Sequence, residues 1–480
     1  MDFSHLSGSA IARLIKDRDA SPTELMTQAL LRAQEVQERL NPLVTIAHEH
    51  AMAQAQQAET ALKNSAQDTL PPFLGVPFTV KDLLDTSGVR TTYGSKALEH
   101  NIPTQTVVAV ARLIAAGAIL IGKTTTSEFA SKVTTDSPLT GATLNPWAPT
   151  LSAGGSSGGA GVCAATGVAP WNISTDGGGS SRIPAAVCGV LGLKVTIGAI
   201  PHESWPFHFG NNSSVSLNCQ HTEDLVELFN LMSGSHHLDP WSRRNPASLS
   251  MPTHSEQAVT GKRGLYIPAI AGTQCDVSYK AVVDDALKKL ETLGLNIDVA
   301  TGDPTEFNPG IATQMMICNL AARVRQLPTE SQNVLGPVLQ SLLDDDKFKS
   351  DGVQVQADAI SRSQLYDRLE KLLGNYDFIL SPTLTAPPPL ADPAKDQSVL
   401  INGIGTSIEK WWTHLSVVNL TGHPAISIPC GTDNNLPVGL HAIAGWDREQ
   451  DLVSLASAVS TFNHWTEHHP PDLPVADASN

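Results

Sequence analysis

The chain has 480 residues, of which 41% are hydrophobic and 5% aromatic, and its formal net charge at pH 7 is −16. This composition is typical of a soluble globular protein. The acidic balance, with a pI near 5.4, argues against binding to nucleic acids or anionic membranes, whose phosphates need basic patches. No run approaches roughly 18 uncharged apolar residues, and the first residues, MDFSHLSGSAIARLIKDRD, lack an apolar stretch. We therefore expect neither a membrane span nor a secretory signal.

The cysteines and histidines indicate a cytoplasmic protein without a metal. Six cysteines are scattered without C-x-x-C spacing, which favours free thiols in a reducing compartment; they are Cys163, Cys188, Cys219, Cys275, Cys318 and Cys430. His236 and His237 are adjacent, but no carboxylate or third histidine stands at ligand spacing. We therefore expect no bound metal and no other cofactor.

The first 65 residues are predicted to be helical. Helical periodicity runs from Ile11 to Leu40, and Ser21 to Glu24 (SPTE) forms a capping box with proline in the first turn. A second helix is expected from about Glu49 to Lys63. We expect region 1–65 to pack on the outside of the body, where a contact in a homodimer is a further hypothesis.

Residues 66–467 are expected to form one α/β domain. The run Phe73 to Val80 (FLGVPFTV) predicts a buried strand that ends at Lys81. A helix over Thr106–Ala116 and a strand over Ala118–Gly122 complete a βαβ unit with parallel pairing. Active sites gather at strand ends in such sheets, so Lys81 is a candidate catalytic lysine, with Lys123 as its rival. A lone lysine next to an aspartate is also common in surface ion pairs.

The stretch Leu151–Gly192 is the most unusual part of the chain, with eleven glycines and six serines in 42 residues. A flexible linker would have that composition, but small apolar segments alternate with the two serine clusters, which favours a buried structure. Gly177, Gly178 and Gly179 precede Ser180, so backbone N–H groups could converge there on an oxyanion. A plain glycine turn between a strand and a helix would look the same.

A serine nucleophile also needs a base. The chain has 16 histidines, but none stands in an evident triad context, and the G-x-S-x-G pattern is absent around Ser180. It is present around Ser156, where a glycine-rich run makes the match weak. A lysine whose pKa is lowered by burial is the alternative base, and Lys81 is the candidate.

The rest of the domain is predicted to alternate helices and strands around a loop-rich middle. Residues 233–260 predict a surface loop, and 338–375 predict charged helices that would form a lid over a pocket. The remaining expected elements are strands over Gly264–Ile270, Leu295–Ala300, Tyr376–Leu380, Ala425–Pro429 and Val438–Ala444, and helices over Tyr279–Leu293, Thr313–Leu327 and Arg448–Phe462. The tail, 468–480, is expected to be disordered.

Four motifs in this order resemble the amidase signature family: GVPFTVKD, GGSSGG, TDGGGSSRIPAA and CGVLGLK. Segments before and after them, such as TLNPW and NLTGHPAISIPCG, are similar to family segments as well, so the likeness covers most of the chain. The resemblance implies an α/β fold with a large central mixed β-sheet flanked by helices on both faces. It places the signature core at 75–200 and a variable lid and pocket region at about 233–375.

The resemblance also implies a catalytic set. Ser156 and Ser180 are 24 positions apart, as are the family's two catalytic serines. Ser180 then corresponds to the nucleophile that forms the acyl-enzyme, Ser156, which follows a cis peptide bond, to the bridging serine, and Lys81 to the base. The N–H groups of 177–180 would form the oxyanion hole. The sequence departs from the family at Gly177, where a larger residue is common, and at Ser181 and Val195, which we interpret as tuning.

The substrate pocket is predicted less directly. The resemblance places Ala130 near the substrate. In the branch that includes 6-aminohexanoate-cyclic-dimer hydrolases, aryl acylamidases and urethanases, it also places Cys318 there, although Cys318 would equally suit a Met/Cys core stripe. The segment 202–212 (HESWPFHFGNN) offers Trp205 and Phe207 either as pocket wall or as a plug into the body, and Trp411 with Trp412 belongs to the same hypothesis.

These observations predict a cytoplasmic serine hydrolase that cleaves the C–N bond of a small, mostly uncharged amide. Alkyl, aryl and cyclic amides fit, and carbamates or esters remain open because they use the same acyl transfer. The first alternative is the glutaminase component of a tRNA-dependent amidotransferase, which shares the signature. The second is a non-catalytic scaffold, which would have no need of Lys81, Ser156 and Ser180 together.

Overall fold

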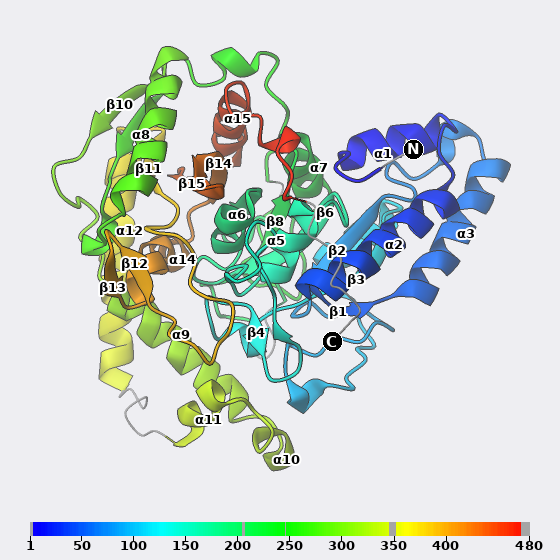
Figure 1. Cartoon of the computed structure of the whole chain (residues 1–480), viewed down its shortest axis with the longest axis horizontal. Coiled ribbons are helices and arrows are strands. Elements are labelled where there is room, and N and C mark those ends of the chain that lie inside the picture. The colour runs from blue at the N-terminus through cyan, green and yellow to red at the C-terminus, as the bar shows by residue number, and fades with distance from the viewer. Residues whose placement is uncertain (1–2, 204–206, 245, 345–351, 472–480) are drawn as a thin grey trace.

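The computed structural model describes residues 3–203, 207–244, 246–344 and 352–471. Its central feature is a mixed sheet that contains eleven strands among the described residues, in the order β1-β3-β2-β6-β8-β7-β14-β15-β11-β9-β10 (Figure 1). These strands are β1 (Leu43–Ile46), β2 (Pro77–Lys81), β3 (Ile119–Thr124), β6 (Trp171–Asp176), β7 (Leu191–Lys194), β8 (Ser214–Cys219), β9 (Arg263–Tyr266), β10 (Asn296–Val299), β11 (Phe378–Pro382), β14 (Ala425–Asp433) and β15 (Leu436–Ile443). Two short pairs lie outside the sheet: β4 (Asp136–Ser137) with β5 (Gly141–Ala142), and β12 (Val399–Ile401) with β13 (Ile404–Thr406).

Both strand directions occur in the large sheet. Strand β2 pairs in parallel with β3 and β6, and β9 pairs in parallel with β10 and β11. The central strands β8, β7, β14 and β15 pair antiparallel with their neighbours. The α/β class with a large mixed sheet is thus confirmed. The predicted βαβ unit is also present, as β2, helix α4 and β3.

Helices cover both faces of this sheet (Figure 1). They are α1 (Gly8–Lys16), α2 (Pro22–Leu40), α3 (His48–Asn64), α4 (Val108–Ala115), α5 (Gly158–Ala165), α6 (Arg182–Cys188), α7 (Thr222–Met232), α8 (Val277–Thr292), α9 (Pro309–Val324), α10 (Thr329–Gln332), α11 (Pro337–Asp344), α12 (Gly352–Leu373), α13 (Glu409–Trp412), α14 (Val417–Thr421) and α15 (Glu449–Ser460). None of the helices in the described ranges combines the length and the apolarity that crossing a bilayer requires.

Apolar side chains on the two faces of the sheet belong to two different core clusters. Phe78, Val80 and Leu120 pack with helices α4, α7, α8 and α15 on one face, whereas Ile119 and Ile121 pack with α2, α3, α5 and α6 on the other. Successive residues of a strand point to opposite faces. The side chain of Lys81, which follows Val80, therefore points to the face of α5 and α6.

The sequence prediction differs from the structure at several places. The periodic segment 11–40 forms two helices, α1 and α2, because Ser21 accepts a hydrogen bond from the Glu24 N–H and starts a new helix with Pro22 in its first turn. Strand β1 was not predicted, and it ties region 1–65 to the sheet by antiparallel pairing with β3. Strand β8 and helix α7 were also missed, although SVSLNC alternates polar and apolar residues with the period of a strand.

The other predicted helices and strands are present with shifted ends. All six cysteines are free, as expected, and Cys163 and Cys188 are fully buried. Of the predicted tail, 472–480 lies outside the described residues, whereas the ring of His469 stacks on that of His5.

Helix α5 is packed closely against two backbone segments. A β-carbon on Gly159 would lie 2.4 Å from the Pro42 carbonyl oxygen and 2.5 Å from the Thr125 amide nitrogen. Such distances are shorter than van der Waals contact, so the helix can approach only because it carries glycine there. This approach sets the position of the segment that precedes α5, which carries Ser156.

We predict that Gly159→Ala lowers the free energy of unfolding by about 1–3 kcal/mol, because the added methyl must displace backbone atoms. Thermal or urea unfolding measures the change. Gly352→Ala is the control, since nothing lies within 4 Å of its β-carbon position, and we expect no loss there. Equal stability of Gly159→Ala and the wild type would contradict the tight packing.

Candidate active site

Lys81 lies at the end of β2 and has no accessible surface. Its Nζ donates hydrogen bonds to Ser156 Oγ at 2.8 Å, Ser157 Oγ at 2.7 Å and Thr175 Oγ1 at 3.1 Å. No ion pair of Lys81 with a carboxylate occurs among the described residues. The hydrogen-bond partners of this buried amine are neutral hydroxyls. Because no negative charge among them stabilises the ammonium form, burial favours loss of its proton.

The two predicted serines continue the chain of contacts. Ser156 Oγ and Ser180 Oγ are 3.1 Å apart, and the Gly155–Ser156 peptide bond is cis, as the resemblance implies. Ser156 is fully buried, whereas Ser180 is partly exposed. The three side chains that we predicted to act together therefore form one hydrogen-bonded line, from a sealed amine to an accessible hydroxyl.

Burial lowers the pKa of Lys81 to about 7, although the charge of Asp176 acts in the opposite direction. A large fraction of Lys81 is thus neutral near pH 7 and able to accept a proton. Ser157 supports this amine, because its hydroxyl lies 3.2 Å from the carbonyl oxygen of Thr175. Donation to that carbonyl leaves the oxygen of Ser157 as an acceptor for Lys81.

The rival lysine has a different environment. Lys123 is also fully buried, and burial lowers its pKa to about 8. Its Nζ, however, donates to the carbonyl oxygen of Leu84 and to Thr86 Oγ1 and makes no hydrogen bond to Ser156 or Ser180. This geometry favours Lys81 over Lys123 as the base.

The structure corrects the predicted oxyanion hole at Gly179. The Gly179 N–H donates to Asp176 Oδ1 at 2.7 Å, so it cannot bind an oxyanion at the same time. The N–H groups of Gly177, Gly178 and Ser180 make no hydrogen bond within the described residues, and all three residues line the cavity described below. The candidate donors are therefore these three.

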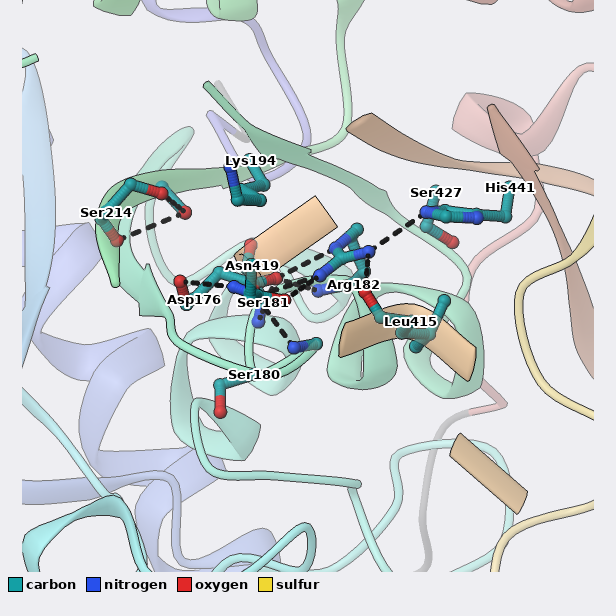
Figure 2. A network of polar contacts seen from close by, with 12 residues as sticks. Asp176, Ser180, Ser181, Arg182, Lys194, Ser214, Leu415, Asn419, Ser427 and His441 are labelled. Atoms are coloured by element: carbon teal, nitrogen blue, oxygen red, sulfur yellow. Dashed lines mark hydrogen bonds and ion pairs between the residues drawn. The ribbon is translucent and has the colours of Figure 1, made fainter. Parts of the chain in front are cut away.

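The buried ion pair of Asp176 and Arg182 contacts the loop 177–180 on the side away from the cavity. The carboxylate of Asp176 accepts hydrogen bonds from Arg182 Nε and a terminal nitrogen of Arg182, both at 3.0 Å. Arg182 also donates to the Leu415 carbonyl oxygen, Asn419 and His441. Figure 2 shows this cluster on one side of the loop and the Ser180 side chain pointing away from it.

Opposing effects act on the charge of Asp176. Burial would raise the pKa of Asp176, but the charge and hydrogen bonds of Arg182 and the hydrogen bond from Asn419 keep that pKa below its ordinary value. The carboxylate is therefore ionised and accepts the N–H of Gly179 at all ordinary pH values. Ser181, the departure from the family pattern, joins a further buried network, because its hydroxyl lies 3.0 Å from Asn218 Oδ1 and 3.1 Å from Ser174 Oγ.

Ser180 opens into a cavity of about 690 Å³. The cavity wall is mainly apolar; it includes Leu83, Val107, Phe129, Met316, Leu320 and Trp412. Two of its charged residues contact other groups of the chain, since Lys132 contacts Asp136 and Glu203 accepts the Val108 N–H at 3.2 Å. A third, Arg323, lies over the rings of Tyr93 and Phe129.

The predicted pocket residues fall into three groups. Ala130 and Phe207 line the cavity. Trp205 lies outside the described residues. Trp411 and Cys318 are not among the residues that line it.

The positions of Trp411 and Cys318 outside the cavity wall follow from the geometry of their helices. Trp411 is fully buried and its indole donates to the Ala386 carbonyl oxygen at 2.8 Å, whereas the next residue, Trp412, faces the cavity. On α9 the cavity is lined by Met316, Leu320 and Arg323, which share one face at the spacing i, i+4, i+7. Cys318, two residues after Met316, lies on the opposite side of that helix.

The sequence did not indicate the roles of several residues near the nucleophile. Asp176 and Thr175 stand next to the glycine run and were visible only as part of the motif. His202 and Arg323 line the cavity, but they come from a loop and a helix far apart in the sequence. Their convergence depends on the tertiary fold, so no local pattern could have revealed it.

The family model described as Amidase matches residues 24–453. The chain belongs to the amidase family. It is 33% identical over 485 residues to an acylamidase of Rhodococcus erythropolis, covering 97% of both chains. It is also 28% identical over 490 residues to one component of the glutamyl-tRNA(Gln) amidotransferase of Synechococcus sp. (strain JA-3-3Ab), covering 96% of this chain and 93% of the relative.

Solved structures show the same fold. The amidase superimposes on a bacterial aryl acylamidase with a TM-score of 0.87 and 24% identity, covering 97% of this chain and 98% of the other. It superimposes on 6-aminohexanoate cyclic dimer hydrolase, complexed with substrate, with a TM-score of 0.84 and 24% identity, covering 98% and 99%. The chain is thus an amidase-signature hydrolase that acts on C–N bonds in amides, and enzymes of this family act on small amide substrates.

We predict that Asp176→Asn lowers the free energy of unfolding by about 3–5 kcal/mol, because it leaves the buried Arg182 without its charge partner. Thermal unfolding measures the loss. Asp298→Asn is the matched control, since Asp298 pairs with Arg263 at the same 3.0 Å but both side chains are more than half exposed, and we expect little change there. Similar stabilities of the two variants would contradict the role of the buried pair.

Proposed function

We propose that this amidase hydrolyses a small, mostly uncharged amide through an acyl-enzyme on Ser180. The observation that supports this most directly is the line of hydrogen bonds from the sealed Lys81 through Ser156 to the accessible Ser180. Neutral Lys81 takes the proton of Ser156 while Ser156 takes that of Ser180, whose oxygen attacks the carbonyl carbon. The carbonyl oxygen becomes an oxyanion that accepts hydrogen bonds from Gly177, Gly178 and Ser180.

The second half of the reaction reverses the relay. The proton held by Lys81 returns through Ser156 to the leaving nitrogen as the C–N bond breaks, and the free amine departs. Water then gives a proton to the same relay, attacks the acyl carbon, and releases the acid and Ser180. A carbamate or an ester would react by the same steps, so amide and carbamate hydrolysis are both within the proposal.

The cavity supports the choice of substrate. Its apolar wall and its volume of about 690 Å³ suit a small organic molecule. Lys132 is paired with Asp136, and the other charged residues of the wall (Asp85, Glu203, Arg323 and Glu409) are few beside its apolar residues, so the proposal names a mostly uncharged substrate. Alkyl, aryl and cyclic amides are the classes that this proposal includes. A homodimer and a cytoplasmic location remain predictions from the sequence.

The second candidate function is that of the glutaminase component of a tRNA-dependent amidotransferase. It is supported by the 28% identity to a component of a glutamyl-tRNA(Gln) amidotransferase. A glutaminase would release ammonia from glutamine, whose charged α-amino and α-carboxyl groups need paired counter-charges. Ammonia release from glutamine and co-purification of a second protein chain would favour it. Hydrolysis of anilides without a partner would favour the first proposal.

We predict that a fluorophosphonate probe forms one adduct on Ser180 and that Ser180→Ala forms none. Intact-mass spectrometry with peptide mapping detects the adduct. Ser181→Ala is a neighbouring control, because Ser181 is fully buried in the network with Ser174 and Asn218, and this variant should still label. An adduct on another serine, with Ser180→Ala fully active, would contradict the proposal.

We predict that kcat/KM for an amide rises with pH and levels off above an apparent pKa near 7. The active form has neutral Lys81, whose pKa is about 7, so each pH unit below 7 should lower the rate about tenfold. Initial rates between pH 5 and 9 measure this, with circular dichroism to show that the protein stays folded. A rate that falls as pH rises through 7 would contradict Lys81 as the base.

A further inference from the structure

His202 is held firmly in the wall of the cavity, although it lies in the connection between β7 and β8. Its backbone N–H donates to Asp239 Oδ2 at 2.9 Å. The next residue, Glu203, accepts the Val108 N–H at 3.2 Å and contacts His236. The imidazole therefore stands on a backbone that is fixed from both sides, and it lines the same cavity as Ser180.

The two ring nitrogens of His202 have different surroundings. Nδ1 is sealed from solvent and has no hydrogen-bond partner within the described residues. Nε2 also makes no hydrogen bond to the described part of the chain, but it is not sealed. Because the ring lines the cavity, the accessible nitrogen is the one that a bound molecule can reach.

This difference determines which nitrogen carries the proton. A buried N–H without an acceptor is rarer in proteins than an acceptor without a donor, so Nδ1 holds the lone pair and Nε2 holds the proton. Burial lowers the pKa of His202 to about 4, and the positive charges of Arg323 and Lys81 act in the same direction. The ring is thus neutral near pH 7 and presents an N–H donor to the cavity.

We propose that the Nε2–H of His202 binds an oxygen atom of the substrate outside the bond that is cleaved. The preferred substrates are then amides whose acyl or amine part carries a second acceptor, such as a ketone or an ether oxygen. The positive charge of Arg323 opposes a cationic amine at this position and suits an oxygen that bears partial negative charge. This inference rests on the proposed amide hydrolysis and names the substrate class more closely.

Two matched substrate pairs test the proposal. The acyl pair is 4-oxopentananilide and 4-methylpentananilide, which differ by a carbonyl oxygen in place of a methyl group. The amine pair is 4′-methoxyacetanilide and 4′-ethylacetanilide. We expect the wild type to prefer the oxygen-bearing member of one pair about threefold to tenfold in kcat/KM, as one neutral hydrogen bond allows.

Two variants separate the hydrogen bond from a structural role. His202→Leu keeps an apolar side chain of similar length and removes the donor, so we expect it to abolish the preference within that pair. His202→Gln places an amide N–H near Nε2 and should restore part of it. The measured quantity is the ratio of kcat/KM for the two substrates of a pair. A loss of folded protein lowers both values equally and leaves this ratio unchanged.

A measurement of substrate binding tests the hydrogen bond of His202 without requiring hydrolysis. For any pair that is not hydrolysed, calorimetry with the Ser180→Ala protein compares the two dissociation constants. Preferential binding without hydrolysis would support the role of His202 and overturn the proposed function. No preference in either pair by rate or by binding, or a preference unchanged in His202→Leu, would overturn this inference and leave the proposed function standing wherever anilides are cleaved.

Discussion

The mechanism proposed for this amidase depends on one amine kept away from water. Lys81 is fully buried, and within the described residues its nitrogen contacts three hydroxyls and no carboxylate. A nearby carboxylate would hold the proton on the lysine and remove the base. The hydroxyl groups accept the hydrogen bonds of the Lys81 amine without adding a negative charge beside it. The buried negative charge is that of Asp176, and it is neutralised by Arg182.

The Asp176–Arg182 pair lies between the proposed base and the loop proposed to bind the oxyanion. One oxygen of the Asp176 carboxylate accepts the Gly179 N–H and the other accepts the Ser181 N–H, so the N–H groups of the residues before and after Ser180 point toward this carboxylate. The remaining N–H groups, of Gly177, Gly178 and Ser180, are left for the cavity. A loop of three glycines would otherwise have many conformations, and the buried carboxylate selects one of them. This explains why glycine-rich sequence and rigid geometry occur together here.

Sequence reasoning reached the parts of this structure that are encoded locally. The strand that ends at Lys81, the cap at Ser21 and the serine clusters at Ser156 and Ser180 are short patterns with a direct physical meaning. Strand β1 was missed because four residues, LVTI, carry too little periodicity to separate a strand from a loop. The segment 202–212 and Trp412 were proposed as pocket wall from their aromatic residues, but Arg323 was not, since it meets them only after distant segments pack. Gly179 failed as an oxyanion donor for a similar reason: only the folded structure reveals that Asp176 already takes its N–H.

The contacts of Arg182 have a consequence for the order in which the protein is made. Leu415 and Asn419, which accept hydrogen bonds from Arg182, follow Ser180 by more than two hundred positions, and His441 comes later still. A ribosome that has completed the glycine-rich core has therefore not yet produced the groups that fix it. The Ser180 loop therefore gains its contacts with Leu415, Asn419 and His441 only after nearly all of the chain has been made. Catalytic competence is thus a property of nearly the whole polypeptide, acquired at the end of its synthesis.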